Sequence, residues 1–264
     1  MSDQADQTIA ALRSGHDELA AVVSNMNPDD LARPSAASEW DISQVLSHLG
    51  SGAEIGLAAL ETALKGTAAP AADFNQTVWA RWDAMTSSEH AENFLRADET
   101  LVERYEGLDD TTRAQLRIDL GFLPEPVDVA TSAALRLSEF TYHAWDIQVM
   151  SDPAAVLAPA AVPLLLAPLG MLIGFIGHSD ALDGSQVTLA VQTTEPDRSF
   201  GLDLRDGVTL VDAPAQSAGV LHAPAETWLR LIAGRLAPQH TPSALRLTSD
   251  AITLDDLRRV FPGF

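Results

Sequence analysis

The sequence predicts an α+β protein, in which a helical bundle is followed by a small α/β domain. Apolar residues recur at helical spacing in several segments between residues 4 and 150. After about residue 183 the pattern changes to short alternating segments bounded by turn residues. The length of 264 residues exceeds one typical domain, so we place one domain at 1–180 and a second at 181–264.

Four helices are predicted in the first domain. The first covers about residues 4–26 and is ended by Asn27-Pro28-Asp29-Asp30. The second begins near Asp41 and runs to about Lys65, with the apolar stripe Ile42, Val45, Leu46 and Leu49. The third begins near Ser87 or Ser88, either of which suits an N-cap, and the fourth covers about 129–150. Residues 66–73 are expected to form a loop, and residues 107–127 are ambiguous.

The segment from Pro153 to Gly177 contains no charged residue and is long enough to span a bilayer. However, it contains four prolines, and Asp152 and Asp180 flank it where Lys or Arg would be expected. We therefore interpret it as a buried helix that is irregular at its start.

The second domain is predicted from its strand patterns. Residues 187–193, 199–204 and 208–211 read as strands, and Asp206-Gly207 between the last two is a hairpin signal. A further strand at 219–222, a helix at 224–236, a short strand at 245–247 and a helix at 255–260 complete the chain.

Composition narrows the range of functions. The net charge of -21 disfavours binding to nucleic acid or to an anionic membrane. The expected partner is a small-molecule substrate, and the expected assembly is a monomer or homodimer. There are no cysteines, so any thiol chemistry must take its sulfur from a cosubstrate. The N-terminus lacks the pattern of a signal peptide, which indicates a cytoplasmic protein. Neither a Gly-rich phosphate loop nor a Gly-x-Ser-x-Gly elbow is present in the sequence.

Glu139 and His143 are the first candidates for a metal site. Their spacing of four residues places them on one face of the fourth helix, one turn apart. The same stripe holds Asp146 among mostly apolar residues, and unpaired charges on a buried face are costly. A metal ion would remove that cost, whereas the plain alternative is a surface pair of the i,i+4 type.

His48 is the third candidate, on the flank of the apolar stripe of the second helix. Two histidines and one glutamate form a zinc-binding set that leaves one coordination position open. Asp146 would orient an imidazole or act as a fourth ligand. Zinc is the divalent metal that this ligand set favours, and nickel and iron suit the same ligands.

Two motifs resemble those of a known family. Ser38-Glu-Trp-Asp-Ile-Ser-Gln-Val-Leu-Ser-His48-Leu49 resembles the start of the second helix in DinB-like metal-binding bundles, and Glu139-Phe-Thr-Tyr-His143-Ala-Trp-Asp146 resembles their second metal motif. Their order and separation are similar to those of the mycothiol-dependent maleylpyruvate isomerase family of actinobacteria. That family joins a DinB-like four-helix bundle to a sterol-carrier-like domain, which residues 187 to about 236 resemble here.

The resemblance implies that His48, Glu139 and His143 hold zinc, which binds the thiolate of mycothiol. In such an isomerase the thiolate adds to a conjugated cis double bond, and rotation and elimination then give the trans product. The same thiolate would serve an S-transferase. Candidate partners for an anionic substrate are Arg81, Arg136 and Arg230.

The sequence also allows two alternatives to a thiol-dependent enzyme. One is metal-dependent hydrolysis, with water in place of the thiol. The other is a non-catalytic protein with a small-molecule-binding or regulatory role. Trp40 is expected to anchor the start of the second helix, and Tyr142 either packs or donates a hydrogen bond to a ligand. His16 is expected to be an ordinary surface or core histidine.

Overall fold

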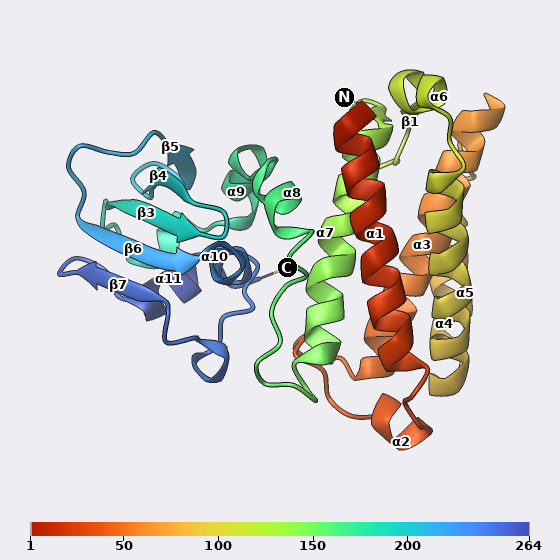
Figure 1. Cartoon of the computed structure of the whole chain (residues 1–264), viewed down its shortest axis with the longest axis horizontal. Coiled ribbons are helices and arrows are strands. Elements are labelled where there is room, and N and C mark those ends of the chain that lie inside the picture. The colour runs from red at the N-terminus through yellow and green to blue at the C-terminus, as the bar shows by residue number, and fades with distance from the viewer. Residues whose placement is uncertain (1, 264) are drawn as a thin grey trace. The chain divides into compact units, whose positions relative to one another are not determined.

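The computed structural model describes residues 2–263 and divides after Asp152 into two compact units. The first unit is a helical bundle and the second is a small mixed sheet with helices, so the predicted α+β class is confirmed (Figure 1). The division lies earlier in the chain than the expected boundary at residue 180. The segment between the two positions belongs to the second unit, because α8 (Val162–Leu166) contacts α10 (Ala225–Ile232) and α9 (Leu169–Ile176) contacts β5 (Thr209–Val211).

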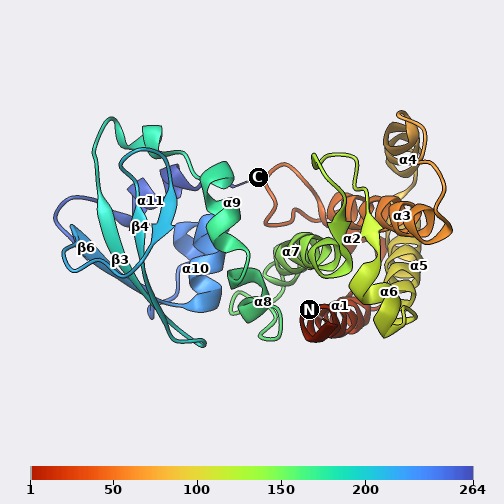
Figure 2. The ribbon, with the colours of Figure 1, turned by 90° about the horizontal axis from the view of Figure 1, so that it is seen from above.

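The first unit contains seven helices and one two-stranded ribbon among the described residues. Their bounds are α1 (Ser2–Val23), α2 (Pro28–Leu31), α3 (Ile42–Lys65), α4 (Phe74–Asp83), α5 (Ser87–Glu106), α6 (Asp110–Gln115), β1 (Arg117–Ile118), β2 (Val127–Asp128) and α7 (Val129–Gln148). The four long helices α1, α3, α5 and α7 contact one another in a closed ring, which makes them a four-helix bundle (Figure 2).

Side-chain caps determine where the long helices begin. Asp41 and Gln44 form a capping box that begins α3, and Thr86 with Glu89 begins α5 one residue before the predicted Ser87 or Ser88. Gly66, with φ of 61°, ends α3 in the left-handed region that a glycine adopts without strain. These caps set the two ends of the helix that carries His48.

The bundle core consists of large apolar side chains from all four helices. Fully buried members include Leu12, Leu19, Leu46, Leu49, Phe94 and Phe140. Helix α4, which the sequence patterns did not predict, packs against α3 and contributes the buried indole of Trp82. This core holds α3 and α7 against each other, which brings the two metal motifs together.

The second unit is built on a five-stranded sheet. Its elements are α8 (Val162–Leu166), α9 (Leu169–Ile176), a 3-10 helix (Ser179–Leu182), β3 (Thr188–Thr194), β4 (Arg198–Asp203), β5 (Thr209–Val211), β6 (Gly219–Pro224), α10 (Ala225–Ile232), a second 3-10 helix (Pro238–His240), β7 (Arg246–Ser249) and α11 (Leu254–Val260). The strand order is β5-β4-β3-β6-β7, with β3 and β6 parallel and the other neighbours antiparallel. Helix α10 packs on β3 and β6 and buries Trp228.

One prediction for this unit is wrong. The uncharged segment at 153–177 is not a single buried helix but two short helices, α8 and α9, separated at Ala167 and Pro168. Proline at 168 has no amide hydrogen to continue the helix. Phe175 on α9 is 86% exposed, so the segment is also not fully buried. None of the helices described is long and apolar enough to cross a bilayer.

Candidate metal centre

The structure brings His48, Glu139 and His143 together on facing sides of α3 and α7. Each residue offers one ligand atom, and the three atoms lie within 4.8 Å of one another. Nε2 of His48 lies 3.1 Å from Oε2 of Glu139, and Nε2 of His143 lies 3.9 Å from the same oxygen. Ligand atoms around a tetrahedral zinc ion with bonds of about 2.0–2.1 Å are roughly 3.4 Å apart, so this set needs little movement to hold one.

The three side chains differ in their access to solvent. The side chains of His48 and Glu139 are 40% and 43% exposed, whereas that of His143 is only 9% exposed. A set that combines one buried ligand with two half-exposed ligands has an open side. A catalytic zinc site needs an open side for its fourth coordination position, whereas a structural zinc site is closed by four protein ligands.

Glu139 is held in its charged form. Its burial acts to raise the pKa, but the hydrogen bond with His48 and the electrostatic interactions with His143, His48 and Arg136 outweigh that effect, so the pKa of Glu139 lies below its ordinary value. A metal ligand must be deprotonated to bind. Glu139 is therefore ready to coordinate a cation at neutral pH.

Asp146 orients the buried histidine. Nδ1 of His143 lies 2.9 Å from Oδ2 of Asp146, a carboxylate that accepts the Nδ1 proton. With the proton on Nδ1, the lone pair of the imidazole is on Nε2, the nitrogen closer to Glu139. The predicted role of Asp146 beside an imidazole agrees with this geometry.

The three arginines considered as anion partners are all committed to carboxylates. Arg81 pairs with Glu54, Arg136 with Asp98 and Arg230 with Glu226. Arg136 also lies close to Gly52 of α3, since its Nη1 would be 3.3 Å from a Cβ added at Gly52. Each of the three guanidinium groups therefore already has a carboxylate partner within the chain.

A second cluster consists of His16, Asp17 and Glu99. It lies in a chain of alternating charges in which Nδ1 of His16 is 2.8 Å from Asp98 and Nε2 is 2.7 Å from Glu99. Arg136 binds the other oxygen of Asp98, and Arg13 binds Glu99. Because carboxylates hold both nitrogens of the imidazole, this cluster is an ion-pair network that ties α1, α5 and α7 together.

Sequence reasoning missed two relationships here. His16 has buried partners, and Trp40 does more than anchor a helix, since its ring lies 5.1 Å from the ring of His48 and 5.8 Å from that of His143, centroid to centroid. Both relationships join residues from different helices or loops, so spacing along one helix carries no signal of them.

The fold and the cluster define a two-part protein with a His2Glu centre in a helical bundle. Residues 12–148, more than half of the chain, match the model of the mycothiol maleylpyruvate isomerase N-terminal domain. The chain belongs to this family. No curated protein sequence matches it.

Solved structures support the same fold assignment. The crystal structure of the mycothiol-dependent maleylpyruvate isomerase superposes with a TM-score of 0.64 over 94% of this chain and 95% of that chain, at 13% sequence identity. The structure of a histidine-to-alanine mutant of that enzyme matches with the same values. At this identity the likeness shows the fold alone.

Proposed function

We propose that this protein is a zinc-dependent enzyme that uses a small thiol, mycothiol, to isomerise a small electrophile or to transfer the thiol to it. The observation that carries the proposal is the cluster of His48, Glu139 and His143, with ligand atoms within 4.8 Å and one open side. Zinc bound there would lower the pKa of a coordinated thiol and keep it nucleophilic at neutral pH. The absence of cysteine from the chain agrees with a thiol that comes from a cosubstrate.

The donor set fits zinc in three respects. Two imidazole nitrogens and one carboxylate oxygen are the borderline ligands that zinc prefers. The pKa of Glu139 is lowered, so no proton competes at this oxygen near neutral pH. Asp146 leaves Nε2 of His143 as the coordinating atom. Each feature belongs to residues of this chain and stands independently of the family resemblance.

The first test is zinc content per chain after purification without chelator or affinity-tag metal. We expect close to one zinc per chain in the wild type and strong loss in His48→Ala and Glu139→Gln. Glu92→Gln is the matched control, because Glu92 is an exposed carboxylate of α5 outside the cluster. A wild type that neither contains zinc nor takes it up at neutral pH would refute the proposal.

The second test is turnover. Maleylpyruvate is offered with mycothiol, with another thiol, and without any thiol, and the cis-to-trans conversion is followed by absorbance. Conversion that requires both zinc and thiol supports the proposal. Thiol-independent consumption of ester or amide substrates would show a hydrolase instead. Full zinc occupancy without turnover of any electrophile tested would favour a binding protein.

A further inference from the structure

Trp40 contacts both histidines of the cluster. Its ring plane is tilted by 43° to that of His48 and by 31° to that of His143, with centroids 5.1 and 5.8 Å away. The two imidazoles meet edge to face at 4.8 Å. Three rings from a loop and two helices therefore form one packed group, and rotation of either imidazole is limited by the indole.

The two histidines differ in what else orients them. Nδ1 of His143 is bonded to Asp146, which sets its tautomer and its ring angle. Within residues 2–263 no comparable partner is found on Nδ1 of His48, which contacts Glu139 through Nε2 and packs against the rings of Trp40 and His143. Metal-bound histidines are normally oriented by a second interaction. For His48, the contact with the indole of Trp40 provides this second interaction.

The loop that carries Trp40 is rigidly built. This Trp40 loop, residues 32–41, is closed on itself because the amide and the hydroxyl of Ser35 both donate to the carbonyl of Trp40, at 3.0 and 2.9 Å. The amide of Trp40 donates to Ala37, and Ile42 donates to Arg33. Glu39, directly before Trp40, has φ of 69°, a left-handed conformation that costs a non-glycine residue about 1–2 kcal/mol.

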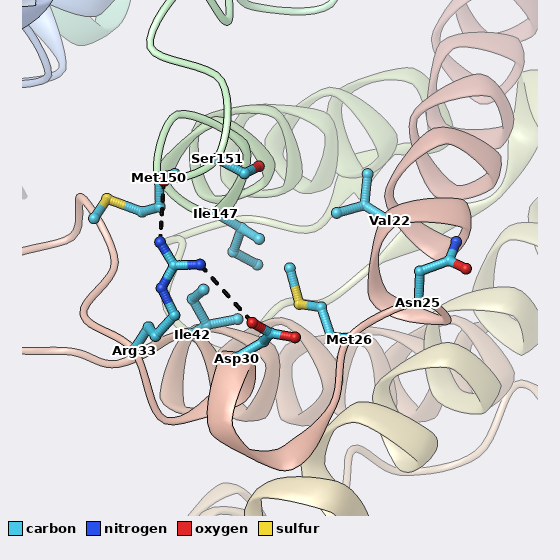
Figure 3. A pocket seen from close by; sticks show the side chains of 9 residues that line it. All are labelled: Val22, Asn25, Met26, Asp30, Arg33, Ile42, Ile147, Met150 and Ser151. Atoms are coloured by element: carbon cyan, nitrogen blue, oxygen red, sulfur yellow. Dashed lines mark hydrogen bonds and ion pairs between the residues drawn. The ribbon is translucent and has the colours of Figure 1, made fainter.

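The Trp40 loop is also fastened to α7 and the residues that follow it. The amide of Ala36 donates to the backbone carbonyl of Asp146 at 2.9 Å, and Arg33 donates to the carbonyl of Met150 at 3.4 Å (Figure 3). Asp146 thus orients His143 with its carboxylate and holds the loop with its carbonyl. Arg33 also lines a pocket of about 220 Å³, which is smaller than typical small-molecule sites of about 300–1,000 Å³.

We infer that Trp40 is a positioning residue of the metal centre, whose indole fixes the orientation of the His48 and His143 rings. The inference rests on the proposed zinc site. The Trp40 loop is closed by its own hydrogen bonds and bonded to Asp146 and Met150. It thereby places the indole against two candidate ligands on different helices. This arrangement orients the two histidines before a metal ion binds. Such preorganisation increases the affinity of the site for the metal ion.

The test compares zinc affinity in wild type, Trp40→Phe and Trp40→Leu, by competition with a chromophoric chelator. Removal of an outer partner of a ligand typically costs about 10–100-fold in metal affinity. We expect Trp40→Leu to bind zinc at least about tenfold more weakly, and Trp40→Phe, which keeps an aromatic face, to be intermediate at about threefold. Visible absorption of the cobalt-substituted proteins reports the ligand geometry, and the band should shift in the same order.

Two other tryptophans provide matched controls. Trp79 is 45% exposed, and Trp79→Leu should leave zinc affinity and the cobalt spectrum unchanged. Trp82 is buried against Gly50, and Trp82→Leu should lower the melting temperature without the graded loss of affinity. The pair separates a general loss of stability from a local loss of ligand orientation.

The outcomes distinguish this inference from the proposed function. If wild type binds zinc and both Trp40 variants match it in affinity and cobalt spectrum, Trp40 is not a positioning residue and the zinc centre stands. If wild type binds no zinc, both the proposed zinc site and the role of Trp40 are refuted. Should Trp40→Leu not fold, Trp40→Phe decides alone, since wild-type affinity and an unshifted cobalt band in that variant would overturn the inference.

Discussion

Asp146 accepts the Nδ1 proton of His143 across 2.9 Å, and both side chains are buried. The two residues are three positions apart on α7, so the pair forms within one turn of a single helix. It fixes which nitrogen of His143 is available to a metal, and it does so without any movement of α3. This pair is the part of the site least dependent on how the bundle packs.

Asp146→Asn should weaken zinc binding by about 10–100-fold, because the amide cannot take part in the charged hydrogen bond that holds His143 in its tautomer. The measurement is zinc competition with a chelator at neutral pH. Asp83→Asn changes the same charge at an exposed position of α4 and should have no effect. Equal affinities in Asp146→Asn and wild type would mean that the pair has no role in ligation.

The sequence was sufficient to predict the bundle and the three clustered residues, for local physical reasons. The spacing of four between Glu139 and His143 puts them on one face of any helix, and the stripe from Ile42 to Leu49 orients His48 relative to the core. Helix α4 was missed because it follows an Ala/Pro-rich loop and buries only Val78 and Trp82, which makes a weak pattern.

Relationships between elements could not be predicted in this way. Asp98 meets His16 across 82 positions of sequence, and a helical pattern for either helix says nothing of that pair. Trp40 reaches His143 only because the loop before α3 is fastened to Asp146. In both cases the partner is chosen by tertiary packing, which periodicity does not encode.

His16 should make stability depend on pH. Its burial lowers the pKa, but the hydrogen bond to Asp98 and the charges of Asp98 and Glu99 together raise the pKa above its ordinary value near 6.5. The folded state therefore prefers the protonated form, so this contribution is complete below about pH 6.5 and is lost as pH rises through the raised pKa. We expect the free energy of unfolding of wild type to fall from pH 6 towards alkaline pH.

His16→Gln should remove that component of the pH dependence, measured by urea denaturation at several pH values. At pH 6 the variant should be less stable than wild type by about 1–3 kcal/mol, because it loses charged hydrogen bonds in a buried site. The gap should narrow as pH rises. A constant gap at all pH values would show that the proton on His16 is not linked to folding.

Arg136 and Asp98 form the buried core of the same network. Asp98 is fully buried, and Nη2 of Arg136 lies 2.6 Å from its Oδ1 and 2.9 Å from the carbonyl of Leu49. Arg136→Met leaves a buried carboxylate with one cationic partner fewer and should cost about 3–5 kcal/mol. Asp98→Leu should cost a similar amount, because it strands the guanidinium.

The double variant Arg136→Met/Asp98→Leu should be more stable than the sum of the single effects predicts, since neither charge is then left alone. Urea denaturation of wild type, the two single variants and the double variant gives the interaction energy between the two side chains. An interaction energy near zero would show that the two side chains contribute independently, contrary to the hydrogen bond seen between them. All four proteins are compared at one pH, and the loss of the Asp98 partner of His16 is common to both proteins that carry Asp98→Leu.

Gly50 of α3 is required by the ring of Trp82. A Cβ built at Gly50 would lie 2.1 Å from Cη2 and 2.5 Å from Cζ3 of this rigid, fully buried indole. Gly50→Ala therefore forces a displacement that should cost about 1–3 kcal/mol, more than the roughly 1 kcal/mol that alanine gains over glycine in a helix.

Gly56→Ala on the same helix is the matched control, because its Cβ would meet only Leu101 at an ordinary 3.6 Å. Thermal unfolding should show a lower melting temperature for Gly50→Ala and an unchanged or higher one for Gly56→Ala. Equal melting temperatures for the two variants would mean that Trp82 yields easily and that α4 is only loosely packed on α3.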